Sequence, residues 1–173
     1  LDGTSEMWSL IDWFHLNSIL YDSVTDSLIL SGKNQDILVS INYSTLELNW
    51  VLGDPTNWED TFVSDYFLTP IGLDFEWQYG QSDVALLANG DLLIFDNGIN
   101  KSKLREQDIT ALDTYSRAVV YRVDSSLMTI EQIEQYGKEL GTVFYSPEYG
   151  NVAAHSNTNI LIHSGENTMI NGE

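Results

Sequence analysis

Three histidines have the widest range of chemistry in this sequence: His15, His155 and His163. A neutral imidazole acts as a nucleophile, a proton acceptor or a metal ligand near neutral pH. His163 ends the apolar run of ILIHSG, an unusual end for a strand, and His15 lies in DWFHLNS. A histidine can equally be a hydrogen-bonded structural residue, and His155, beside a polar turn, fits that interpretation best. We therefore weigh His15 and His163 as catalytic candidates.

Further polar residues are candidates for binding a substrate. Asn17 follows the first histidine by two residues, and Ser82 lies in YGQSDV at the equivalent point of a second segment. The FDNG turn is followed by Lys101 and Arg117, which can supply positive charge for an anion. Arg117 can equally pair with a nearby carboxylate, and the turn can be purely structural.

The sequence lacks the common signatures of metal, nucleotide and serine chemistry. There is no cysteine, no H-E-x-x-H, no EF-hand spacing, no glycine-rich phosphate loop and no G-x-S-x-G. We therefore predict no metal site and no cofactor.

The elements that position these candidates follow a pattern of four predicted strands that repeats along the chain. Ser31, Phe95 and His163 are equivalent, with spacings of 64 and 68 residues. The stretch EQIEQYGKEL (131–140) is rich in Glu and Gln, which favour a helix, but the segment 129–137 occupies the position of 46–54 and we predict a strand there. The predicted strands are 17–22, 27–34, 36–43 and 46–54 in the first copy, 83–88, 91–98, 116–124 and 129–137 in the second, and 150–155 and 159–166 in the third.

Repeated four-stranded antiparallel units are typical of propeller blades. We predict an all-β chain, a segment of a β-propeller in which residues 1–173 form one unit with blades at 12–54, 77–137 and 145–173. Since closure takes about four to eight blades, about two and a half do not close a propeller. The chain is then a segment of a longer protein or completes itself by association, and we expect the segment. Open strand edges at both ends would allow self-association. The first strand of each blade lines the channel of a propeller, so residues at its entrance should converge on one axial site.

Composition restricts the partners. The formal net charge is −19, from 26 acidic and 7 basic residues, so the surface should repel nucleic acid. No apolar segment is long enough for membrane insertion as a helix. An anionic substrate would need a local group of the few cations.

The order of these motifs resembles that of the bacterial PAPS-independent arylsulfate sulfotransferases, and the resemblance covers nearly the whole chain. The motifs that carry it are DWFHLNSILYD (12–22), DSLILSGKNQ (26–35), WVLGDPTNW (50–58), LTP (68–70), FDNG (95–98), YSRAVVYRVD (115–124), EQYGKELG (134–141) and YSP (145–147).

This resemblance implies a six-bladed propeller and an enzyme outside the cytoplasm, in the periplasm, secreted or at the cell surface. It implies sulfuryl transfer from a phenolic sulfate ester to a phenol through a sulfated histidine, without a cofactor. His163, downstream of YSP, would be the nucleophile. His15 would help to hold the sulfate, with Asn17 and Lys101 as further anion-binding groups.

Two positions depart from the family pattern. Ser82 stands where members commonly carry histidine, and Lys101 where they carry arginine. Serine brings neither charge nor an imidazole, and lysine gives a point charge instead of a bidentate fork. The alternative function is therefore a non-catalytic propeller segment that acts as a binding or structural module, and we expect the isolated chain to turn over poorly.

Overall fold

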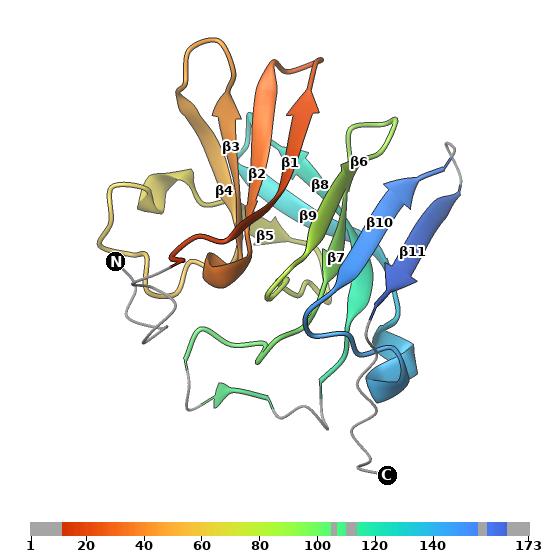
Figure 1. Ribbon diagram of the computed structural model, residues 1–173. Coiled ribbons are helices and arrows are strands. Elements are labelled where there is room, and N and C mark those ends of the chain that lie inside the picture. Colours follow the sequence, from red (N-terminus) through yellow and green to blue (C-terminus); the bar gives the residue numbers. More distant parts are fainter. Residues whose placement is uncertain (1–11, 105–106, 110–113, 156–158, 166–173) are drawn as a thin grey trace.

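The computed structural model describes residues 12–104, 107–109, 114–155 and 159–165, and these residues form three sheets (Figure 1). The prediction of an all-β chain is confirmed. The strands are β1 (Leu16–Asp22), β2 (Ser27–Gly32), β3 (Ile37–Asn42) and β4 (Leu48–Leu52) in the first sheet, β5 (Thr69–Ile71), β6 (Asp83–Leu86), β7 (Leu92–Asp96), β8 (Arg117–Asp124) and β9 (Thr129–Tyr136) in the second, and β10 (Gly150–Ala154) and β11 (Ile160–Ser164) in the third.

Short 3₁₀ turns lie between some of these strands: η1 (Lys33–Gln35), η2 (Ser64–Tyr66) and η4 (Lys138–Val143). Within the described residues, no helix has both the length and the apolar character that crossing a membrane requires.

The second sheet confirms one predicted strand and adds one that was not predicted. The segment rich in Glu and Gln is the strand β9, paired antiparallel with β8, so the helical alternative is wrong. Its Ile130 is fully buried, and this tertiary contact outweighs the local helix preference. The segment 54–80, where no strand was predicted, contributes β5, which adds to the sheet parallel to β9. Within the described residues, the second sheet thus has five strands and the first has four.

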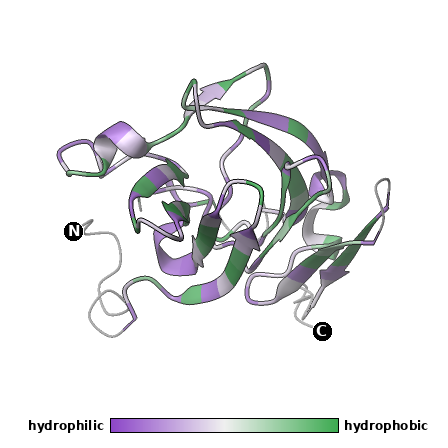
Figure 2. Cartoon of the chain, turned by 90° about the horizontal axis from the view of Figure 1, so that it is seen from above, coloured by the Kyte–Doolittle hydropathy of each residue, from purple (hydrophilic) through white to green (hydrophobic). Residues whose placement is uncertain are grey.

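The strand β7 explains how successive sheets pack. All five of its residues are buried, and neighbouring side chains point to opposite faces. Leu92 and Ile94 join the cluster packed against the first sheet, whereas Leu93 and Phe95 join the cluster with Val152 of β10. The second sheet is therefore packed on both faces. Figure 2 shows the hydrophobic and hydrophilic residues along its strands.

The first strands of the three repeats lie side by side, as Figure 1 shows for β1, β6 and β10. Asp83 of β6 joins them, because its carboxylate accepts hydrogen bonds from Ser18 Oγ of β1 (3.2 Å), from the Val152 amide of β10 (3.0 Å) and from Asn151 Nδ2. Sheets that pack face to face with their first strands together are consistent with propeller blades.

Outer faces at both ends of the described sheets expose apolar side chains. In β1, Leu20 packs into the cluster between the first two sheets, so Ile19 and Tyr21 point the other way and are 61% and 50% exposed. In β11, Ile160 and Ile162 pack toward the second sheet, and Leu161 is 58% exposed. Self-association through these ends remains a prediction.

Candidate functional site

The candidate residues gather at one end of the sheets because of antiparallel pairing. A first strand begins where its hairpin partner ends, so the segments before β1, β6 and β10 lie beside the ends of β2, β7 and β11. We call this the lower end, after its position in Figure 1. The contact between Asn97 Nδ2, after β7, and the Ser146 carbonyl, before β10, shows the same proximity (2.7 Å).

His15 lies at the lower end, directly before β1, in the left-handed backbone region with a φ of 50°. The carboxylate of Asp12 accepts a hydrogen bond from the His15 amide (3.0 Å) and contacts the ring Nδ1. An imidazole that donates its Nδ1 proton to a carboxylate keeps a lone pair on Nε2. The His15 side chain is 45% exposed.

Asn17 and Ser82 each join one repeat to the next at the lower end. Asn17 Nδ2 donates to the Gln81 carbonyl (2.8 Å), and its Oδ1 is buried without a hydrogen-bond partner among the described residues. The Ser82 hydroxyl donates to the Gly150 carbonyl in front of β10 (2.8 Å). These contacts span 64 and 68 residues, which are the predicted repeat spacings. The structure therefore brings both residues to the lower end, as expected for entrances of first strands.

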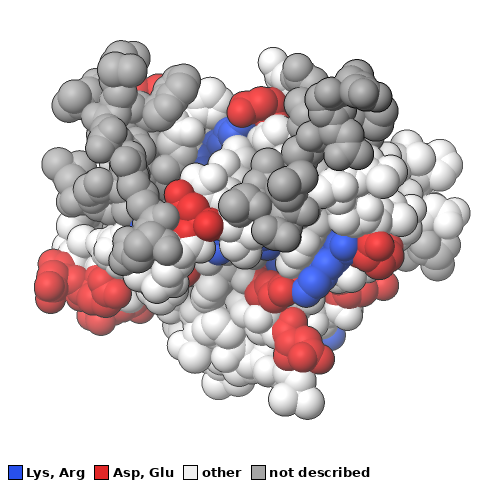
Figure 3. All heavy atoms as spheres, turned by 90° about the horizontal axis from the view of Figure 1, so that it is seen from below, with Lys and Arg blue, Asp and Glu red and all other residues white. Residues whose placement is uncertain are grey.

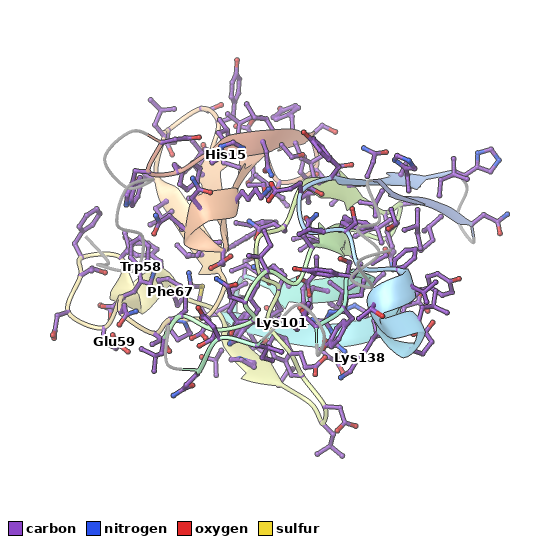
Figure 4. All side chains as sticks on the ribbon, turned by 60° about the horizontal axis from the view of Figure 1, so that its bottom comes forward. His15, Trp58, Glu59, Phe67, Lys101 and Lys138 are labelled. Atoms are coloured by element: carbon purple, nitrogen blue, oxygen red, sulfur yellow. The ribbon has the colours of Figure 1, made fainter. Side chains whose placement is uncertain are left out.

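Aromatic rings from the segment before β1 and from the segment after β4 pack with one another. Trp13 stacks on Phe14 with ring centroids 5.8 Å apart, and Trp58 meets Trp13 at 6.4 Å and Phe67 at 5.9 Å. Figure 4 shows Trp58 and Phe67 together beside the first sheet. These rings form a packed cluster with Ile37 and Val51.

Arg117 and Lys101 belong to a buried charge cluster of the second sheet. Arg117 has no exposed side-chain surface and pairs with Asp96 through Nε (2.9 Å) and with Glu76 through Nη1 (3.0 Å). Lys101 Nζ lies 3.4 Å from Asp96 and 4.1 Å from the centroid of the Tyr115 ring. Figure 4 shows Lys101 apart from His15. The structure therefore brings Lys101 and Arg117 together, but not with His15.

Charge and burial set the pKa values in this cluster. Burial alone would raise the pKa of Asp96, but Lys101 and Arg117 outweigh it and hold that pKa below its ordinary value. Burial lowers the pKa of Lys101, and the charge of Asp96 opposes this shift. Each charge in the cluster is therefore compensated from within the fold.

His163 lies in β11 opposite Asn151, and its side chain is exposed. His155 follows β10, where its amide donates to the Asn159 carbonyl (2.9 Å). The contacts of the described residues include none that joins His163 to His15. The third sheet therefore holds His163 at the lower end but on a second strand, whereas His15 precedes a first strand.

Lys33 is a cation at the lower end that the sequence interpretation did not single out. Its amide donates to the His15 carbonyl (3.2 Å), and its Nζ lies 3.0 Å from Glu148 Oε2. The available signal was its position in SGKN, at the end of a second strand and therefore next to the entrance of the first.

The sequence matches the arylsulfotransferase (ASST) family over residues 2–173. The chain belongs to this family. Two curated relatives are named arylsulfate sulfotransferase AssT: the protein of Escherichia coli O6:H1 is 36% identical and that of Lelliottia amnigena 34% identical, each over 152 residues. Each match covers 79% of this chain and 25% of the relative, so the chain spans about a quarter of the length of these proteins.

The two departures from the arylsulfotransferase pattern now have a structural setting. The Ser82 proton is donated to a backbone carbonyl, and the Lys101 charge is compensated by Asp96. Among the described residues, no group of three or more His, Asp or Glu side chains is arranged to hold a metal ion.

All described basic side chains form ion pairs with carboxylates. On the face in Figure 3, basic and acidic side chains accordingly lie side by side, and undescribed residues cover part of the view. The pairs are Lys33–Glu148, Lys101–Asp96, Lys103–Asp36, Arg117 with Asp96 and Glu76, Arg122–Asp91 and Lys138–Glu76. An anion that binds to one of these described cations must therefore displace or share its carboxylate partner.

Proposed function

We propose that the natural full-length protein containing this chain transfers a sulfuryl group from a phenolic sulfate ester to a phenol, without PAPS, through a sulfated histidine. Family membership supports arylsulfotransferase chemistry. The observation that carries the proposed site is the position of His15, held by Asp12 and bonded through its backbone to Lys33, where the first strands converge.

The chemistry needs two displacements. In the first, the imidazole lone pair forms a bond to sulfur while the S–O bond to the donor phenol breaks, and the phenolate leaves with the electron pair. In the second, the acceptor phenol oxygen bonds to sulfur, the N–S bond breaks, and the phenol proton passes to a base. The sulfuryl oxygens gather negative charge in both steps, so a nearby ammonium such as that of Lys33 stabilises them.

Two histidines compete for the role of sulfuryl acceptor. The resemblance assigns it to His163, with His15 binding the sulfate. The geometry favours His15, because Asp12 orients its ring and leaves Nε2 free at the lower end. His163 instead lies on β11, the second strand of its repeat. No contact between the described residues joins it to His15 or Asp12.

The experiment compares His15→Ala and His163→Ala in the full-length protein. The assay mixes 4-nitrophenyl sulfate with a phenol acceptor and follows nitrophenol release. We expect release to fall by a factor of roughly 10³ or more in the variant that lacks the acceptor, and less in the other. Undiminished release in both variants would exclude both assignments.

A non-catalytic binding module is the second candidate, and Ser82 favours it. The family pattern has a histidine at this position, and here the hydroxyl is used to join two repeats. In that case the protein binds aryl sulfate but releases no nitrophenol, and Ser82→His increases release. Robust release by the unmodified protein excludes this second function.

A further inference from the structure

The ion pair between Lys33 and Glu148 joins distant parts of the lower end. Lys33 belongs to η1, after β2, and Glu148 precedes β10 of the third repeat, 115 residues away. Lys33 Nζ donates to Glu148 Oε2 (3.0 Å) and approaches the Glu148 carbonyl oxygen at 3.4 Å. An ammonium has three N–H donors, so this contact uses two of them.

The two partners differ in burial. The Lys33 side chain is 12% exposed, whereas that of Glu148 is 62% exposed. Lys33 therefore cannot leave its position without exposing its apolar stem, but Glu148 can turn into water at little cost.

The ion pairs of Asp96 and that of Lys138 do not offer this combination. In the cluster of Lys101 and Arg117, the shared carboxylate of Asp96 is fully buried, and removing it would leave buried charges unpaired. Lys138 is itself 43% exposed, so water already solvates its ammonium. The Lys33–Glu148 pair thus consists of an ammonium fixed by burial and a carboxylate that can be displaced.

We propose that Glu148 occupies the anion position on Lys33 in the free protein and that the sulfuryl group of an aryl sulfate displaces it. This inference rests on the proposed function. A carboxylate and a sulfuryl group both present negatively charged oxygens to an ammonium, so they compete for the same donors. Glu148 therefore sets the affinity for the donor: it keeps Lys33 compensated when the site is empty and weakens sulfate binding.

The test measures binding of inorganic sulfate to the full-length protein by isothermal titration calorimetry. Since an exposed ion pair is worth little, Glu148→Gln should tighten sulfate binding about two- to fivefold. Lys33→Met in the Glu148→Gln background should abolish that gain. The matched control is Glu59→Gln, which removes the same charge from an exposed residue that lies apart from His15 (Figure 4).

Kinetics separate this inference from the proposed function. With 4-nitrophenyl sulfate, Glu148→Gln should lower KM by the same factor and leave kcat unchanged, because the contact exists only before the donor binds. Tighter sulfate binding without any nitrophenol release would keep the inference and reject the transferase function. Equal effects of Glu148→Gln and Glu59→Gln, or no effect on sulfate binding, would overturn the inference even in an active enzyme.

Discussion

Replacing Arg117 by methionine should strongly destabilise the fold, because the side chain is a structural centre of the second sheet. Its guanidinium donates to the carboxylates of Asp96 and Glu76 and to the backbone carbonyls of Glu76 (2.9 Å) and Trp77 (3.2 Å). Breaking a buried ion pair by removing one partner costs about 3–5 kcal/mol. With an m-value of about 2 kcal/mol/M, the urea midpoint should fall by about 1.5–2.5 M.

The assay is urea unfolding followed by tryptophan fluorescence, and the matched control is Arg122→Met. Arg122 lies in the same strand and also binds a carboxylate, Asp91, with two hydrogen bonds, but its side chain is 53% exposed. Solvent screens such a pair, so the midpoint should stay close to that of the unmodified chain. Equal midpoints for the two variants would refute the structural role of Arg117. A raised KM with unchanged stability would instead support the substrate-binding role expected from sequence.

Two further predictions concern the same region. A Cβ at Gly98, where φ is 72°, would lie 1.9 Å from the Tyr115 carbonyl oxygen, whereas one at Gly90, where φ is 89°, would meet no atom within 4 Å. Gly90→Ala should therefore lower the free energy of unfolding by about 1–2 kcal/mol, because alanine is strained in the left-handed backbone region. Gly98→Ala should lower it by about 1–3 kcal/mol more than Gly90→Ala, because its methyl group also overlaps the Tyr115 carbonyl. Because the pKa of Asp96 is lower in the folded state, its stabilising contribution is complete above its unfolded pKa and is lost as pH falls through the folded value. Acid unfolding curves should therefore fall less steeply in Asp96→Asn, and an unchanged slope would contradict this assignment.

The repeat explains why most of the fold was predictable. Strands that recur at spacings of 64 and 68 residues each have a second copy, so an ambiguous segment can be compared with its counterpart. This comparison predicted a strand instead of a helix for β9. The strand β5 had no such counterpart. It has three exposed residues, Thr69–Ile71, and forms only because β9 offers an open edge for parallel pairing. Such a strand leaves no alternation of apolar and polar residues in the sequence.

The charged part of the candidate site was less predictable, because ion pairing is a long-range property. Lys101 and Arg117 follow the FDNG turn and were expected near the histidines, but Asp96 within that turn binds both of them. The position of Lys33 in SGKN indicated only that it lies at the end of a strand, because its partner Glu148 is 115 residues away. Sequence periodicity thus located the ends of strands, whereas the availability of each cation depended on contacts between repeats.

The same repeat constrains what His163 can contact. Ser31 and Phe95, at the equivalent positions, have no exposed surface, and both face the following repeat: Gln81 Nε2 donates to Ser31 Oγ (3.2 Å), and Phe95 packs against Val152. Ile160 and Ile162 pack toward the second sheet, so His163, which alternates with them, points away from it. A unit that packed on this face would therefore cover His163 as the second repeat covers Ser31. This position suits a residue that joins two units more than an imidazole that must meet a phenolic sulfate, and it adds a second reason to propose His15 as the sulfuryl acceptor.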